Sequence, residues 1–90
     1  MYQLEIRKRA INQAKTAYEW YASIQPELGE KFINNLQACY HKLSTSPMFY
    51  SYIAAPFRKI KLHHFDYILV FEVIENKVVV FALFHTKQKH

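Results

Sequence analysis

The sequence contains little glycine, proline or cysteine: one Gly, three Pro and one Cys among 90 residues. The single cysteine, Cys39, excludes an intramolecular disulfide framework and a zinc finger built on thiolates, and it suits a reducing compartment. Because Gly29 is the only glycine, no glycine-rich loop is present to hold nucleotide phosphates, and chemistry on nucleoside triphosphates has no support. So few turn-forming residues leave little room for linkers, and we expect residues 1–90 to form a single domain.

Long apolar runs are absent as well. The longest candidate, residues 67–84, is interrupted by Glu72, Glu75 and Lys77, whereas a membrane-spanning helix needs about 20 largely apolar residues. At the N-terminus, Glu5 introduces charge too early for the apolar core of a signal peptide. These absences predict a cytoplasmic protein that does not insert into a membrane.

Positive charge and aromatic side chains are what the chain has in excess. Twelve Lys and Arg residues outnumber seven Asp and Glu, which gives a net charge of +5 at pH 7, and 51% of the residues are hydrophobic. Seven Tyr, seven Phe and one Trp accompany that charge. A chain this apolar is not disordered, and its charge favours an anionic partner: nucleic acid, an acidic protein segment or a membrane surface.

Hydrophobic periodicity divides the first half of the chain into one strand and two helices. Apolar residues alternate with polar ones over residues 2–6, the pattern of a half-buried strand. They then recur at steps of three and four, which predicts a helix over about residues 9–24. Pro26 ends that helix and suits the first turn of a second one, whose apolar stripe runs to Leu43. The Ser-Thr-Ser-Pro segment at residues 44–47 ends the second helix.

The second half reads as a loop followed by three strands. Two prolines mark residues 47–56 as a loop, although one rich in aromatic side chains. Period-two patterns and β-prone runs then predict strands with a turn and a short hairpin loop between them: strands at 57–63, 67–74 and 78–85, the turn at 63–66 and the hairpin loop at 75–77. The order β-α-α-β-β-β predicts an α+β fold, in which an antiparallel helix hairpin packs on a small, mainly antiparallel sheet.

This order, together with three local features, resembles the RelE/ParE superfamily of toxins over essentially the whole chain. The features are the end of the second helix, the first two strands of the meander, and the end of the last strand. In the sequence they are Leu43-Ser44-Thr45-Ser46-Pro47, then Phe57-Arg58-Lys59-Ile60 with Phe65-Asp66-Tyr67-Ile68-Leu69-Val70-Phe71, and finally Phe84-His85-Thr86-Lys87.

The resemblance implies a function and a partner. Members are the toxic halves of bacterial type II toxin–antitoxin pairs, associated with growth inhibition and plasmid stabilization. Some enter the ribosome and cut messenger RNA, whereas the ParE-like branch inhibits DNA gyrase. A third possibility is an inactive member that only binds its antitoxin. In each case the resemblance implies a cognate antitoxin, whose disordered tail folds along a cleft between the helix pair and the sheet, helped by the positive charge.

A nuclease of this family needs a base, an acid and a cation, because the RNA 2′-hydroxyl attacks its own phosphate without a metal. Arg58 is the candidate cation and His85 the candidate proton carrier. A second proton carrier is not evident, since no tyrosine follows His85 in the sequence. The incomplete set favours the ParE-like branch and gyrase inhibition; the ribosome-dependent endoribonuclease and the inactive antitoxin-binding module are the alternatives.

Arg58 is the candidate with the most informative position. It shares strand parity with Ile60 and therefore points toward the buried face, where an arginine must reach an edge or be paired. Its guanidinium suits a phosphate, which it would bind through two parallel hydrogen bonds. The structural alternatives are a salt bridge to Asp66 or Glu72 and stacking on Tyr67. By pattern, Arg58 matches an arginine that many members of the superfamily keep here.

Four lysines are candidate contacts to nucleic acid or another anion. Lys59 and Lys61 lie on the strand face opposite Arg58, and Lys87 and Lys89 lie in the C-terminal tail. For the tail lysines a general cationic role is favoured over a catalytic one. His85 ends the last strand and shares its parity with Val79, Phe81 and Leu83. Its structural alternative is a histidine at a strand end that is hydrogen-bonded to a neighbouring carbonyl.

Metal and cofactor sites are not expected. His63 and His64 are adjacent, so they do not readily share one metal ion, and no histidine pair at helical spacing or cysteine partner supports zinc. Cys39 lies on the apolar stripe of the second helix and is expected to pack in the core. Trp20 lies beside the stripe of the first helix, where packing is favoured over a partner-binding role.

Overall fold

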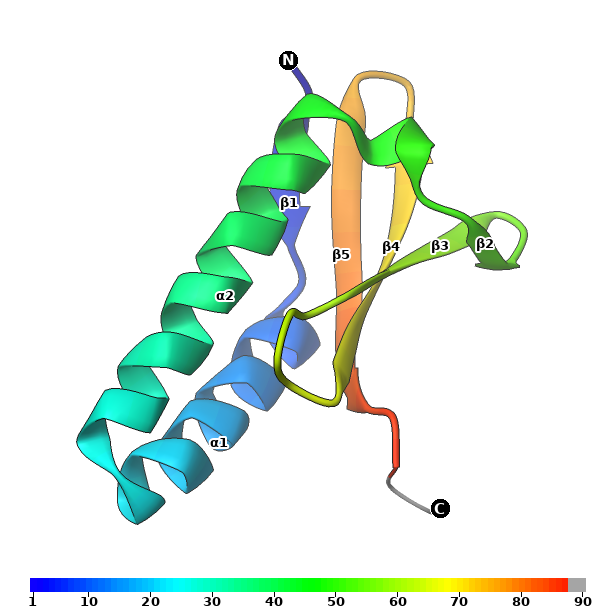
Figure 1. Ribbon diagram of the computed structural model, residues 1–90. Coiled ribbons are helices and arrows are strands. Elements are labelled where there is room, and N and C mark those ends of the chain that lie inside the picture. The colour runs from blue at the N-terminus through cyan, green and yellow to red at the C-terminus, as the bar shows by residue number, and fades with distance from the viewer. Residues whose placement is uncertain (88–90) are drawn as a thin grey trace.

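The chain folds into a five-stranded sheet with two antiparallel helices packed on one face (Figure 1). The structure is a computed structural model, and it describes residues 1–87. Its elements follow one another in this order: β1 (Gln3–Ile6), α1 (Lys8–Ile24), α2 (Pro26–Thr45), a short 3₁₀ helix η1 (Pro47–Phe49), β2 (Tyr52–Ala54), β3 (Phe57–Lys61), β4 (Tyr67–Ile74) and β5 (Lys77–His85). The predicted α+β class and the predicted helix hairpin are confirmed.

The sheet is mainly antiparallel, as predicted. Its strand order is β1-β5-β4-β3-β2, and only the β1–β5 pair is parallel. A parallel pair needs a crossover connection, and the helix hairpin between β1 and the strand meander is part of it. In Figure 1, β5 and β4 stand at the centre of the sheet, and the helices cover one side.

Both helices use small or apolar side chains at helical spacing to cover the sheet. On α1 the buried residues are Ala10, Ala14 and Ala17, whose small side chains let the helix approach its neighbours closely. Pro26 occupies the first turn of α2, where its missing N–H is not needed. Within the described part of the chain, no helix combines the length and the apolar character needed to cross a membrane.

The core is a single cluster between the helices and the sheet. An aromatic group lies at one end of it, where Phe32 of α2 contacts Tyr21, Phe65 and Tyr67, with ring centroids 5.3, 5.3 and 5.7 Å away. Phe32 is fully buried. This group joins both helices to the loop before β4, and so it fixes where that loop stands relative to α2.

The segment predicted as a loop at residues 47–56 contains structure that the sequence pattern did not reveal. Residues 47–49 form η1, and Tyr52–Ala54 form β2, which pairs antiparallel with β3 through Tyr52 opposite Arg58. All three residues of β2 are exposed. An edge strand without a buried face has no alternating apolar pattern, which is why period-two analysis missed it.

A β-bulge changes which residues of β5 face the helices. Val70 pairs with Ala82 while Phe71 pairs with Val80, so Phe81 is an extra residue in β5. The prediction that His85 and Leu83 share a face with Val79 and Phe81 is therefore wrong in part. Leu83 instead lies in the core cluster together with Val78 and Val80. One inserted residue moves every later side chain to the other face.

Gly29 is the point on α2 where a larger side chain would disturb the helix pair. A Cβ there would lie 2.8 Å from the Cβ of Ala22 on α1. We expect Gly29→Ala to lower the free energy of unfolding by about 1–3 kcal/mol through overpacking, despite the better helix propensity of alanine. Urea unfolding is the measurement, and Glu30→Ala on the exposed side of α2 is the control, with a change within about 0.5 kcal/mol. A more stable Gly29→Ala variant would show that the helices have room to separate.

Candidate functional site

Arg58 is the second residue of β3 and points toward the helix-covered face. Its neighbours in the register are Tyr52 on β2 and Phe71 on β4. Only 9% of its surface is exposed, which makes it the one charged residue among residues 1–87 that is classed as buried. The predicted orientation of Arg58 is therefore confirmed: a charged side chain is turned inward at the edge of the core.

The guanidinium of Arg58 is held by the segment that precedes β3. One terminal nitrogen donates to the carbonyl oxygens of Tyr50, at 2.6 Å, and Met48, at 3.5 Å. The other donates to the hydroxyl of Tyr52 at 2.9 Å, and the guanidinium lies over the Tyr52 ring at 4.0 Å. The structure thus has stacking on Tyr52, not on Tyr67, and carbonyl partners in place of a carboxylate. Arg58 ties η1 and β2 to the sheet.

Lys59 and Lys61 flank Arg58 in sequence and lie on the other face of the sheet, as predicted. Both are exposed. Lys61 curls back so that its ammonium donates to the carbonyl oxygens of Leu62, at 3.2 Å, and Phe65, at 3.0 Å. Lys61 therefore uses its ammonium group to hold the loop after β3, and Lys59 is the cation that is more available to a partner.

His85 ends β5 next to Tyr67, its partner in the β4–β5 register. The two rings meet edge to face, with centroids 5.0 Å apart. The Nδ1 atom of His85 accepts a hydrogen bond from the backbone N–H of Lys87 at 3.2 Å. Burial raises the pKa of the Tyr67 phenol, so this hydroxyl stays protonated at neutral pH. The pair forms a polar edge at the open end of the core.

The structure does not bring Arg58 and His85 together. Arg58 is opposite Phe71 and His85 is opposite Tyr67, and four residues along a strand span about 13 Å. The guanidinium of Arg58 is bonded to the segment before β3, whereas the His85 ring contacts Tyr67 at the start of β4. Within the described residues, the two candidate side chains therefore have separate partners and do not form one cluster.

A groove runs between α1 and the end of the sheet that carries His85. Its inner part has a volume of about 430 Å³ and includes Arg9 and Gln13. The outer part, of about 420 Å³, includes Trp20 and Lys87. Tyr67, His85, Thr16 and Ala17 line both parts. Trp20 is 62% exposed here, so its expected packing role is wrong and its ring is available to a partner.

Of the two candidate lysines near the C-terminus, Lys87 lies within the described residues. Lys87 is exposed and forms an ion pair with Asp66 at 3.4 Å. This pair and the hydrogen bond from the N–H of Thr86 to the carbonyl of Asp66, at 2.8 Å, hold the start of the tail against the loop before β4. Lys89, also predicted as an anion contact, lies outside the described residues.

The remaining candidates have structural explanations. Burial raises the pKa of the Cys39 thiol, which keeps it neutral, and the residue packs in the core as expected. Across residues 1–87, no group of three or more His, Cys, Asp or Glu side chains is arranged to hold a metal ion. The rings of His63 and His64 instead lie against each other in a tilted arrangement, with centroids 3.8 Å apart.

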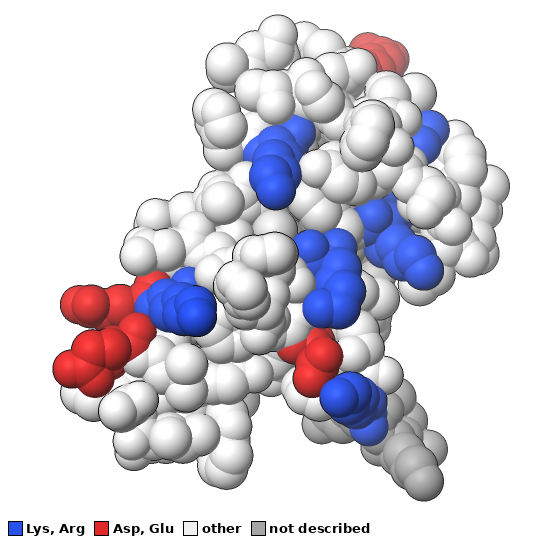
Figure 2. All heavy atoms as spheres, viewed as in Figure 1, with Lys and Arg blue, Asp and Glu red and all other residues white. Residues whose placement is uncertain are grey.

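Positive charge is spread over the molecule more than it is concentrated at one point. In the view of Figure 2, lysine and arginine side chains lie across the middle of the face, and the acidic side chains are mostly at its margins. Elsewhere, Arg7 and Arg9 lie over the rings of Phe81 and Phe84, at 5.5 and 5.3 Å. Such a surface suits an anionic or acidic partner.

Tyr67 was considered from the sequence only as a stacking partner for Arg58, although its pairing with His85 follows from counting residues along the hairpin. Two antiparallel strands joined at residues 75–77 place residues near 67 opposite residues near 85. The predicted strand bounds therefore already contained the Tyr67–His85 contact. The exposure of Trp20 had no comparable signal, because it depends on how far α1 extends past the end of the sheet.

Comparison with known families gives a match over nearly the whole chain. Residues 4–90 match the family model described as "ParE toxin of type II toxin-antitoxin system, parDE". No curated protein matches the sequence at a significant level.

Solved structures share the fold at low sequence identity. A chain of the chromosomal ParDE toxin–antitoxin system from P. aeruginosa superposes with a TM-score of 0.83 at 14% identity, covering 97% of this chain and 98% of that one. A chain of the intact E. coli RelBE toxin–antitoxin complex gives 0.72 at 22% identity, with 98% and 100% covered. The isolated E. coli RelE toxin gives 0.71 at 21% identity, with 100% and 89% covered.

Proposed function

The chain belongs to the ParE toxin family of type II toxin–antitoxin systems, and on this premise we propose that it arrests growth by inhibiting DNA gyrase in the cytoplasm. The observation that carries the proposal is the environment of Arg58. Its guanidinium is occupied by the carbonyl oxygens of Tyr50 and Met48 and by the Tyr52 hydroxyl. The donors of this guanidinium already have partners within the protein. Such an arginine stabilises the shape of a binding surface more readily than it stabilises a reacting phosphate.

Binding without cleavage is also favoured by how the other polar groups are distributed. RNA cleavage by the 2′-hydroxyl needs proton carriers on both sides of one phosphate. His85 lies about 13 Å along the sheet from the level of Arg58, and Lys59 and Lys61 lie on the opposite face. These groups are spaced to contact a broad partner at several points, which suits a large enzyme–DNA complex.

We also propose that the cognate antitoxin is held in the groove between α1 and the end of the sheet. The groove combines an exposed aromatic ring, Trp20, with the cations Arg9 and Lys87 at its borders. An amphipathic segment with acidic residues would bury apolar side chains against Trp20 and meet the cations along the rim. Tyr67 and His85, which line both parts of the groove, would give the segment hydrogen-bonding partners.

Removing the ring of Trp20 is expected to weaken antitoxin binding with little effect on the fold. We expect Trp20→Ala to raise the Kd for the antitoxin encoded by the adjoining frame about tenfold or more, as for a buried aromatic anchor. Calorimetry or fluorescence anisotropy measures this change. Ile11→Ala is the control, because Ile11 is exposed on the same helix but does not line the groove. An unchanged Kd for Trp20→Ala would place the antitoxin elsewhere.

Expression of the chain without its antitoxin tests the gyrase proposal in cells. We expect growth arrest with filamentation and induction of the DNA damage response, and continued synthesis of a translation reporter in the first minutes. Rapid translational arrest with cleaved transcripts would favour the nuclease alternative. Normal growth at confirmed expression would leave only the antitoxin-binding module.

A further inference from the structure

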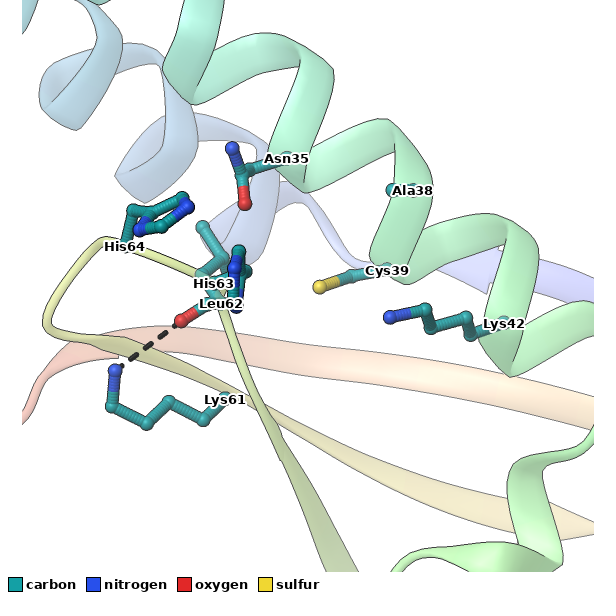
Figure 3. Close-up of a pocket in the computed structure, with 8 residues that line it drawn as sticks. All are labelled: Asn35, Ala38, Cys39, Lys42, Lys61, Leu62, His63 and His64. Carbon is teal, nitrogen blue, oxygen red and sulfur yellow. Dashed lines mark hydrogen bonds between the residues drawn. The ribbon is translucent and has the colours of Figure 1, made fainter.

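A cationic pocket lies between α2 and the loop that joins β3 to β4, away from both the groove and Arg58 (Figure 3). Its volume is about 330 Å³. Polar and charged side chains reach it from three segments of the chain: Asn35 and Lys42 from α2, Lys61 from β3, and His63 and His64 from the loop. Figure 3 shows the two imidazoles facing α2 across the pocket, with the side chains of Asn35, Cys39 and Lys42 on the other side.

Within residues 1–87, no carboxylate is paired with these cations. Among residues 1–87 the ion pairs join Arg7 and Lys77 to Glu5, and Lys87 to Asp66. None of them uses a side chain that lines the pocket. The pocket therefore carries positive charge that none of the described ion pairs balances, an arrangement that favours an anion.

The loop is built so that the two imidazoles keep their place. His64 has a left-handed backbone, with φ of 69°, and its ring lies 3.8 Å from that of His63. Leu62 and Phe65 on either side are buried in the core. The ammonium of Lys61 donates to both of their carbonyl oxygens. These two hydrogen bonds hold the ends of the loop together. A non-glycine residue held at positive φ is a strained feature that tends to accompany binding sites.

The electrostatics of His64 agree with a pocket that attracts an anion. His63 lowers the pKa of His64 most, burial contributes next, and Lys31 and Lys61 add to the effect. Cys39 also lines the pocket, and its raised pKa leaves it neutral. Within residues 1–87, the side chains that shift the pKa of His64 are thus all cationic or imidazole groups, and an anion placed among them would make protonation of the imidazole easier.

We propose that this pocket binds the phosphate group of a phosphate ester, between Lys42 on α2 and the His63–His64 pair. A tetrahedral dianion can accept hydrogen bonds from an ammonium and from imidazole N–H groups at the same time. The volume leaves space for the group to which the phosphate is attached. The site is independent of gyrase inhibition and of the antitoxin groove.

Histidine NMR signals test the proposal with two probes. Sulfate keeps its double negative charge while histidine titrates, between about pH 5 and 8, so it isolates the response of the protein at constant ionic strength. By reciprocal linkage, an anion that binds the protonated pair raises the pKa of His64. We expect sulfate to shift the His63 and His64 signals, to move the His64 titration to higher pH, and to bind more tightly as the pH falls.

A charge-matched pair of variants separates the pocket from general attraction. Lys42→Gln is expected to weaken sulfate binding about fivefold, the effect of one charge contact at an exposed site, whereas Lys15→Gln on α1 leaves it unchanged. A short DNA duplex that produces the same shifts, and loses them in Lys42→Gln, identifies the nucleic-acid backbone as the source of the phosphate. If only sulfate does so, the nucleic-acid backbone is excluded as the source and a free phosphate ester remains. Unmoved imidazole signals with both probes, or equal weakening by the two variants, would overturn the proposal.

Discussion

Replacing Phe32 with alanine is expected to lower the free energy of unfolding by about 3–5 kcal/mol. The side chain is fully buried and its ring contacts Tyr21, Phe65 and Tyr67. Removing it leaves a cavity at the point where α1, α2 and the loop before β4 meet. Since a domain of this length is stable by roughly 5–13 kcal/mol, much of the protein would be unfolded at modest urea concentrations.

Urea unfolding followed by circular dichroism measures this change through the transition midpoint. Phe49→Ala provides a control of identical chemistry, because Phe49 is 84% exposed; its effect should stay within about 0.5 kcal/mol. A loss of less than about 1 kcal/mol for Phe32→Ala would mean that the aromatic group repacks around the gap and does not fix the loop.

Replacing Arg58 with alanine is expected to cost about 2–3 kcal/mol, the value of hydrogen bonds made by a charged donor. The lost stability should first appear as local opening of the structure around Arg58, before the whole domain unfolds. Without the guanidinium, the carbonyl oxygen of Tyr50 and the hydroxyl of Tyr52 lose their donor, and η1 and β2 can separate from β3. The backbone N–H of Lys59 reports this step, since it donates to the carbonyl of Ser51 at 3.2 Å.

Hydrogen exchange at Lys59, together with thermal unfolding, distinguishes this role from others. Arg58→Lys should be intermediate, because one ammonium cannot replace the fork of donors that reaches both tyrosines. Lys59→Ala, on the other face, should leave stability within about 0.5 kcal/mol. Protection of the Lys59 N–H that survives in Arg58→Ala would contradict the anchoring role, and the phosphate contact predicted from the sequence would then be the better explanation for this arginine.

Periodicity and turn residues were enough to predict most of the architecture. Alternation at residues 2–6 and steps of three and four through both helices correspond to strong local preferences, and the structure follows them. β2 was missed because its three exposed residues carry no apolar pattern. The face of His85 was assigned wrongly because Phe81 forms a bulge that no local residue preference announces.

The candidate site, like the fold, was predictable from the sequence only in part. Parity alone predicted that Arg58 points inward, and it does. Its partners were not predictable, because Tyr50 and Tyr52 lie in a segment that tertiary contacts shape and that lacks a pattern of its own. The pocket at His63 and His64 was missed for another reason. Its anion-binding character depends on α2 bringing Lys42 to the loop, a contact between segments some twenty residues apart.

The most direct test of the account uses the purified chain in two assays side by side. In the first, gyrase supercoils relaxed plasmid DNA with increasing amounts of the chain; in the second, ribosomes translate a messenger RNA whose integrity is followed. We predict loss of supercoiling with accumulation of cleaved DNA, relief of both by the antitoxin, and intact messenger RNA. Full supercoiling activity at saturating amounts of folded chain, with ribosome-dependent cuts in the messenger RNA, would contradict the account.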